Sequence, residues 1–262
     1  MASDGFFTDD LRLENAKADM KELKSSAASI HSTATANTLF ENSNTNTSFI
    51  PGRTLLINSR GHALTRLPLP SSELEILICN PDGTPAYIST RGKRSSGDAV
   101  LSSPKSGHLI STSYFFGPMR DPVIRRLGDP DEQLAAIKVS ARCPSRTTRF
   151  TLPDGSKFEW SYIRTRGADK KKVKLLVLDK VDGGTGARRR LAQLRRDDET
   201  RTPGTSKTTA GNGGELLIDQ NAYEALEEPM IVVTCLLMLK KEVDRRRLLQ
   251  FMVVAGVVSG GS

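Results

Sequence analysis

The residues with the clearest chemistry in this sequence are its lysines and arginines. Between Asp169 and Arg201 the chain carries eleven basic residues against six acids, a local charge of +5. If the strands on either side of "DGGTGA" pair as a hairpin, Lys170–Lys172 and Arg195–Arg196 gather at one end of it. Such a cluster suits phosphate head groups, since each basic residue near an anionic membrane contributes about 1 kcal/mol. The alternative is that these side chains are solvated strand ends that keep a sheet edge soluble.

A second basic group lies near the end of the sequence. Lys240–Lys241 and Arg245–Arg247 precede the apolar stretch "LLQFMVVAGVV", residues 248–258. This basic-then-apolar order predicts a membrane contact. The alternative is a tail that packs on the fold or is disordered. The predicted lipid-binding residues are Lys170, Lys171, Lys172, Arg188, Arg189, Arg190, Arg245, Arg246 and Arg247.

Residues suited to catalysis or metal binding are sparse. The histidines are His31, His62 and His108, and none has the spacing of an H-E-x-x-H motif. No G-x-S-x-G sequence that would form a nucleophile elbow is present. The three cysteines lie far apart without C-x-x-C spacing, and the glycine-rich "DGGTGA" lacks the Lys-Ser/Thr of a P-loop. We therefore expect a non-enzymatic protein with no cofactor and no metal.

The charge balance favours acidic partners. Lys and Arg number 38 against 30 Asp and Glu, a net charge of +8, which suits nucleic acid or an anionic membrane face. Anionic membrane lipid, with phosphoinositide as the expected class, is the first predicted partner. The second is another protein, bound by a scaffold through a flexible N-terminus and the loop Asp198–Gly214. Nucleic acid is not favoured, because the basic residues are not interleaved with exposed aromatics.

The location follows from the start of the chain and its cysteines. Early acids and the lack of a continuous apolar run do not fit a secretory signal. An odd number of widely spaced cysteines favours a reducing compartment. We expect an intracellular, cytoplasmic protein that is peripheral at a membrane.

Short β-rich runs separated by turn residues fill the middle of the chain. Hairpin signals such as "NPDG" (80–83) and "PDGS" (153–156) lie between them. Phe158, Trp160 and Tyr162 alternate with polar positions and share one face, which we expect to be core. About ten strands at this spacing predict an antiparallel sandwich or barrel. The predicted strands are residues 53–59, 73–80, 85–90, 108–116, 136–142, 147–152, 157–164, 172–180, 189–195 and 215–219.

The C-terminal apolar segment is too short and too interrupted by charges to span a membrane. Met230–Leu239 is apolar except for Thr234, but ten helical residues span about 15 Å, half of the ~30 Å hydrocarbon thickness. Extending the segment to Val254 would place seven charges near the bilayer centre, at ~2.5 kcal/mol or more each. We therefore expect no transmembrane span.

The same segment has the signals of a helix over about residues 224–248. Pro229 suits a first turn, acids precede it and cations follow. A helix that is apolar on all faces must be enclosed on all faces. The sequence thus predicts a mainly β protein, a closed antiparallel β-barrel around a hydrophobic C-terminal helix. Its expected divisions are a largely disordered segment 1–49, the barrel with its helix over 50–248, and an apolar, glycine-containing tail 249–262.

This arrangement resembles the Tubby C-terminal-like superfamily, which includes Tubby proteins, phospholipid scramblases, LURP-one-related proteins and small fungal relatives. The resemblance lies in the order of elements over about Phe49 to Arg247. It implies a barrel of twelve strands around the helix. The stretches that carry it are "FTLPDGSKFEWSYIR" (Phe150–Arg164), "KLLVLDK" (Lys174–Lys180), "GGELLIDQ" (Gly213–Gln220) and "IVVTCLLMLKKEVDRRR" (Ile231–Arg247).

The chain departs from these families at their functional segments. The phosphoinositide-contacting basic set of Tubby proteins has no residue-by-residue counterpart here. The calcium-binding segment and membrane span that scramblases carry after the barrel are not found either. The resemblance therefore predicts a fold and a class of ligand, and no scramblase activity is carried over.

Overall fold

A computed structural model describes residues 49–69, 73–94, 96–116, 121–128, 136–140, 146–166 and 172–259. The segment predicted to be disordered, residues 1–49, lies outside these ranges except for Phe49. Lys170 and Lys171 of the first basic cluster lie outside them too, and Lys172 is described only as the first residue of a strand.

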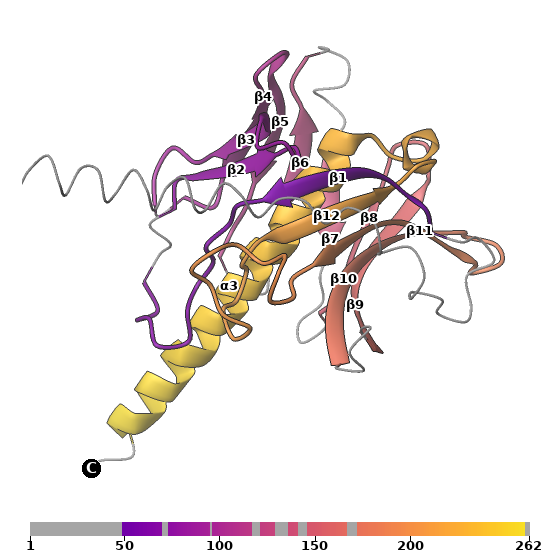
Figure 1. The fold of residues 1–262 in the computed structure, drawn as a ribbon. Coiled ribbons are helices and arrows are strands. Elements are labelled where there is room, and N and C mark those ends of the chain that lie inside the picture. The colour runs from indigo at the N-terminus through magenta and orange to yellow at the C-terminus, as the bar shows by residue number, and fades with distance from the viewer. Residues whose placement is uncertain are drawn as a thin grey trace, which may run out of the picture. The chain divides into compact units, whose positions relative to one another are not determined.

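The described part of the chain forms a closed antiparallel barrel of twelve strands (Figure 1), as predicted. Each strand pairs with its neighbours in sequence, and β1 pairs with β12, which closes the ring. The strands are β1 (Pro51–Ile57), β2 (Glu75–Cys79), β3 (Pro85–Thr90), β4 (Ala99–Ser103), β5 (Gly107–Ser113), β6 (Val123–Arg126), β7 (Ile137–Ser140), β8 (Thr148–Thr151), β9 (Lys157–Arg166), β10 (Lys172–Val181), β11 (Arg188–Arg195) and β12 (Gly214–Asp219).

Ten of these strands match the runs predicted from the residues, and β4 and β6 were missed. β4 is the sequence "AVLSS" and β6 is "VIRR", so both are short and neither contains an aromatic residue. Their place is fixed by pairing instead: β4 lies between β3 and β5, and β6 between β5 and β7. Local propensity is a weak signal where tertiary pairing decides.

A long helix, α3 (Glu228–Ser259), follows β12 after a short 3-10 turn, η1 (Ala222–Glu224). Pro229 lies in its first turn, where the missing N–H has no helical partner to lose. Met230–Leu239 is buried, and the one polar member, Thr234, accepts a hydrogen bond from the indole N–H of Trp160 at 3.0 Å. The helix is therefore enclosed by the barrel, which explains its apolar residues on every face.

The helix does not stop at the barrel. Figure 1 shows α3 passing among the strands and continuing beyond them toward the C-terminus. Residues 249–259, expected as a separate tail, continue the helix. In the described part of the chain, no helix has the length and apolar character needed to span a bilayer.

Candidate functional site

The end of the barrel at which α3 leaves the strands is held by a buried ion pair. We call this end the exit end. The Arg196 guanidinium donates to both oxygens of Glu242 on α3, at 2.7 and 3.0 Å. Glu242 also accepts from the Gly211 N–H at 2.9 Å and from the Tyr162 hydroxyl. Although burial opposes it, this set of donors lowers the pKa of Glu242 to about 2, so the carboxylate stays charged at the exit end.

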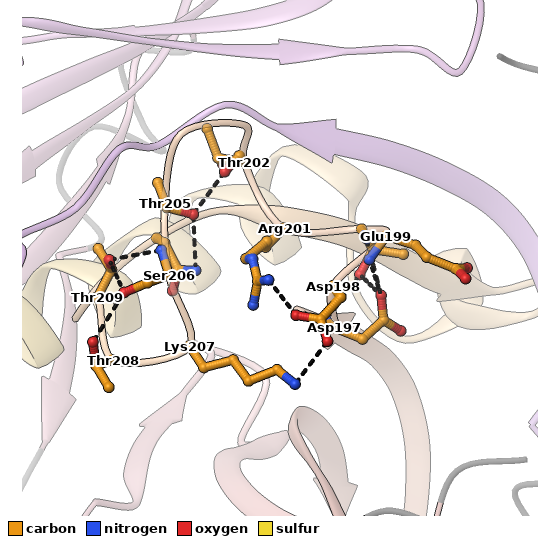
Figure 2. Close-up of polar contacts among 12 residues, drawn as sticks. Asp197, Asp198, Glu199, Arg201, Thr202, Thr205, Ser206, Lys207, Thr208 and Thr209 are labelled. Atoms are coloured by element: carbon orange, nitrogen blue, oxygen red, sulfur yellow. Dashed lines mark hydrogen bonds and ion pairs between the residues drawn. The ribbon is translucent and has the colours of Figure 1, made fainter. Parts of the chain in front are cut away.

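Residues 197–213, between β11 and β12, form one wall of the exit end (Figure 2). The Asp197 carboxylate accepts from the backbone N–H groups of Glu199 and Thr200 at 3.1 and 2.9 Å. Asp198 pairs with Arg201 and, at 2.7 Å, with Lys207. These bonds fold the segment on itself. The predicted long hairpin loop over 198–214 does connect the paired strands β11 and β12, and residues 209–214 at its end are buried against the barrel.

Gly211 explains how closely this segment approaches the helix. Its φ of +71° lies in the left-handed region that favours glycine. A Cβ at this position would come within 2.5 Å of the Leu239 carbonyl oxygen on α3. Only glycine lets the backbone pass here and donate its N–H to Glu242.

The loop after β1 forms the adjoining wall. His62 pairs with Ala210 through the backbone, and its Nε2 lies 3.1 Å from the side-chain oxygen of Gln250 on α3. The Gln250 amide donates to the carbonyls of Leu64 and Arg66 at 2.9 and 3.0 Å. Burial lowers the pKa of His62, so it is held neutral against the helix.

Large apolar side chains are exposed around this exit. They come from the loop after β1, from the residues after β5 and from α3, and each is between 42% and 68% exposed. Their common location follows from the contacts of Gln250 with Leu64 and of Arg247 with Phe116, whose ring lies 4.8 Å from the guanidinium. We call this set the exit patch: Leu64, Leu67, Leu69, Phe115, Phe116, Leu249, Phe251, Met252 and Val253.

Three predicted lipid-binding residues border the exit patch. Arg246 donates to the Thr208 carbonyl at 2.9 Å, and Arg247 donates to the Pro68 carbonyl at 3.3 Å and lies 3.4 Å from Asp244. Arg245 directly precedes them in sequence and is half-buried. The arginines thus fasten both walls to the helix while standing beside exposed apolar residues.

The arginines of β11 have a different environment. Arg188 pairs with Glu159 at 2.7 Å, and Arg190 lies 3.6 Å from Asp179. Both carboxylates are almost fully buried on the outer side of the barrel. Arg189 donates to the Asn221 carbonyl at 2.8 Å and lies near Asp219 and Glu224. These three arginines neutralise neighbouring acids, and they are not brought together with Arg245–Arg247 by any contact described here.

Groups suited to catalysis are not assembled among the described residues. His108 is exposed and its Nδ1 lies 2.7 Å from the Ser102 hydroxyl, and no carboxylate of the described residues bonds to its ring. Within the same ranges, His, Cys, Asp and Glu side chains form no group of three that could hold a metal. His31 lies outside the described residues.

Comparison with family models, with curated proteins and with solved structures gives no match to this chain. Its class is therefore defined by geometry: a closed twelve-stranded antiparallel barrel that encloses a C-terminal helix.

Sequence reasoning found the basic side of the exit end and missed most of its apolar side. Leu64, Leu67 and Leu69 lie in "ALTRLPLP", which was assigned to no helix or strand, and Phe115 and Phe116 were assigned to the end of the predicted strand 108–116. The exposed apolar residues of α3 lie in the stretch 248–258 that was predicted to contact a membrane. For the others, the one local signal is the pair Leu67 and Leu69 in a proline-containing, non-strand segment.

Proposed function

We propose that this protein is a Tubby-like, non-enzymatic binding protein that attaches peripherally to anionic membrane surfaces through the exit end of its barrel. The observation that carries the proposal is the exit patch, in which apolar side chains of α3 and two neighbouring elements are exposed beside Arg245–Arg247. Contiguous exposed apolar residues of this kind mark protein or membrane contacts. Arg245–Arg247 beside the exit patch favour a membrane surface that carries negative charge.

The exposed end of α3 supports a membrane in particular. Leu249, Phe251, Met252 and Val253 follow the three arginines on one continuous helix. Apolar side chains that enter the boundary between head groups and acyl chains, with cations beside them, are the features of interfacial helices. The arginines would each add about 1 kcal/mol of binding free energy near an anionic surface. Phosphoinositide head groups concentrate the most negative charge at such a surface.

Other predicted residues contribute less to this proposal. Arg188, Arg189 and Arg190 each engage acids of the barrel, so a phosphate would have to displace an existing partner. Lys170, Lys171 and Lys172 remain candidates on sequence grounds alone. The scaffold alternative, which uses the N-terminal segment and residues 198–214, gains no support from the second segment because its polar groups bond to one another.

Vesicle sedimentation tests the proposal. The full chain is mixed with neutral vesicles and with vesicles that contain phosphatidylserine or phosphoinositide, at low and physiological salt. We expect salt-sensitive binding to anionic vesicles only. The double variant Leu249→Gln, Phe251→Gln should weaken binding roughly 30-fold, because about 2 kcal/mol of apolar insertion is lost.

Two double variants that remove equal charge test the contribution of the arginines to vesicle binding. Arg245→Ala with Arg246→Ala should weaken binding to anionic vesicles and reduce its salt dependence. Lys138→Ala with Lys157→Ala removes the same charge from exposed strand positions and should leave binding unchanged. Equal loss of vesicle binding in both pairs of variants would mean that only the net charge of the protein matters. Full binding by the Leu249→Gln, Phe251→Gln variant would contradict the proposed surface.

A further inference from the structure

The barrel interior is filled unevenly. On β8 and β9 the inward positions carry large rings, Phe150, Phe158 and Trp160, all buried. On β3, β4 and β5 several inward positions carry small side chains instead. Ala99 faces Thr112 across the β4–β5 pair, and Ser89 faces Leu101 across the β3–β4 pair. Small residues cannot reach the helix, and a cavity of about 70 Å³ remains between this side of the barrel and α3.

One face of the helix lines this cavity. Val233, Leu236, Leu237, Lys240 and Val243 recur at three- and four-residue spacing, which places them on one side of α3. Across from them lie side chains of two kinds. Ile76 and Leu101 are apolar, whereas Ser59, Glu73 and Arg91 are polar or charged. The cavity is thus amphipathic, with its charged groups toward the exit end, where Lys240 precedes the buried ion pair of Glu242.

The charged end of the cavity has an excess cation. Glu73 accepts from the Arg60 N–H at 2.9 Å and from the Ser59 hydroxyl at 3.3 Å, and Arg91 donates to the Glu73 carbonyl. Lys240 lies 4.7 Å from the centre of the Tyr114 ring. Among the residues that the structure describes, it makes no hydrogen bond and no direct ion pair, and Asp98 and Asp244 are near enough to interact with its charge. With Arg91 and Lys240 against Glu73, the lining carries a net charge of +1.

A half-buried ammonium with no hydrogen-bonded anion is costly, and a bound anion would relieve that cost. The cavity also has apolar walls that give water few partners. Its volume limits the ligand: at about 10–15 Å³ for each water-sized group, the space admits roughly five to seven non-hydrogen atoms. A single negative charge on a short apolar chain meets all three conditions.

We propose that this cavity binds a short aliphatic carboxylate of about the size of butyrate. Its carboxylate accepts from Lys240 and Arg91, and its chain lies between Leu101 and the Val233–Leu237 face of α3. This inference concerns the interior of the barrel and does not depend on membrane binding. Loss of vesicle binding in the exit-patch variants leaves it untouched.

Titration of the full-length protein with butyrate tests the site. Binding is followed by backbone amide chemical shifts at constant ionic strength, with chloride as the exchanged anion and butanol as the uncharged comparison. We expect saturable binding with a Kd of about 1 mM or tighter, and at least tenfold weaker binding of butanol. Absence of saturation at 20 mM butyrate overturns the proposal.

Two variants test the volume and the charge of the site. Ala99→Leu fills the cavity beside Arg91, and Lys240→Met removes the charge while keeping the length of the chain. Each should weaken butyrate binding at least tenfold. Lys241→Met is the matched control, because Lys241 is also half-buried on α3 but does not line the cavity. Undiminished binding in both Ala99→Leu and Lys240→Met would place the ligand elsewhere and overturn the proposal. Should Lys240→Met fail to fold, Ala99→Leu and the butanol comparison still decide it.

Discussion

Replacing Glu242 by glutamine should remove most of the stability that the exit end supplies. The change keeps the size of the side chain but leaves the Arg196 guanidinium, whose side chain is 10% exposed, without its charge partner. Breaking one half of a buried ion pair costs about 3–5 kcal/mol. The lowered pKa gives a similar figure: a fall from 4.5 to about 2 corresponds to about 3 kcal/mol of stabilisation of the charged form.

Urea unfolding measures this loss. The chain has a single tryptophan, and Trp160 is fully buried beside α3, so its fluorescence reports loss of the barrel core. We expect the free energy of unfolding of Glu242→Gln to fall by about 3 kcal/mol. Glu224→Gln is the control: Glu224 is 71% exposed and lies 3.6 Å from Arg189, and surface pairs of this kind contribute about 0.5 kcal/mol or less.

A loss below about 1 kcal/mol in Glu242→Gln would refute the reasoning, because the buried guanidinium would then be solvated or paired in another way. A loss of equal size in Glu224→Gln would also count against it. That result would attribute the effect to removal of any carboxylate.

Three further predictions concern the same core. Because the folded-state pKa of Glu242 is depressed, its stabilisation is present above about pH 4.5 and is lost as the pH falls toward 2; acid titration of unfolding should therefore show a steeper decline in the wild type than in Glu242→Gln. Gly211→Ala should destabilise the protein by about 2 kcal/mol or more, because strain at positive φ adds to a clash with Leu239, whereas Gly204→Ala, at φ +74° in open space, should lose only about 1 kcal/mol, both measured by urea unfolding. Thr234→Val should lose about 1–3 kcal/mol, because the Trp160 indole N–H is left without its acceptor; calorimetric melting would reveal it, and an unchanged melting temperature would contradict it.

The fold could be predicted from the sequence because its signals are local. Turn residues such as those at 80–83 and 153–156 delimit strands, and the alternation of Phe158, Trp160 and Tyr162 marks an inward face. The enclosed helix followed from the uninterrupted apolar run at Met230–Leu239. Strands β4 and β6 lack such signals, since their pairing is decided by neighbours that lie beside them only in the folded chain.

The candidate site was harder to predict for the same reason. Basic residues are visible in the sequence, but their partners are distant along the chain. Arg196 pairs with Glu242, which lies 46 residues after it, and Arg188 pairs with Glu159, which lies 29 residues before it. Nothing local shows that one arginine is buried in an ion pair and another borders an exposed leucine. The cavity depends on the sizes of inward residues on several strands, which becomes apparent only with the register of the barrel.

The order of elements along the chain has a consequence for biosynthesis. Ring closure pairs Arg53 of β1 with Ile218 of β12, and the helix that fills the ring is synthesised after all twelve strands. A long stretch of strand sequence therefore emerges from the ribosome before the helix that completes the core has been made. Contacts so distant in sequence form slowly. Nascent chains of this protein should depend on chaperones until residues 230–242 emerge. A premature stop before α3 should yield a product for degradation and no partly active fragment.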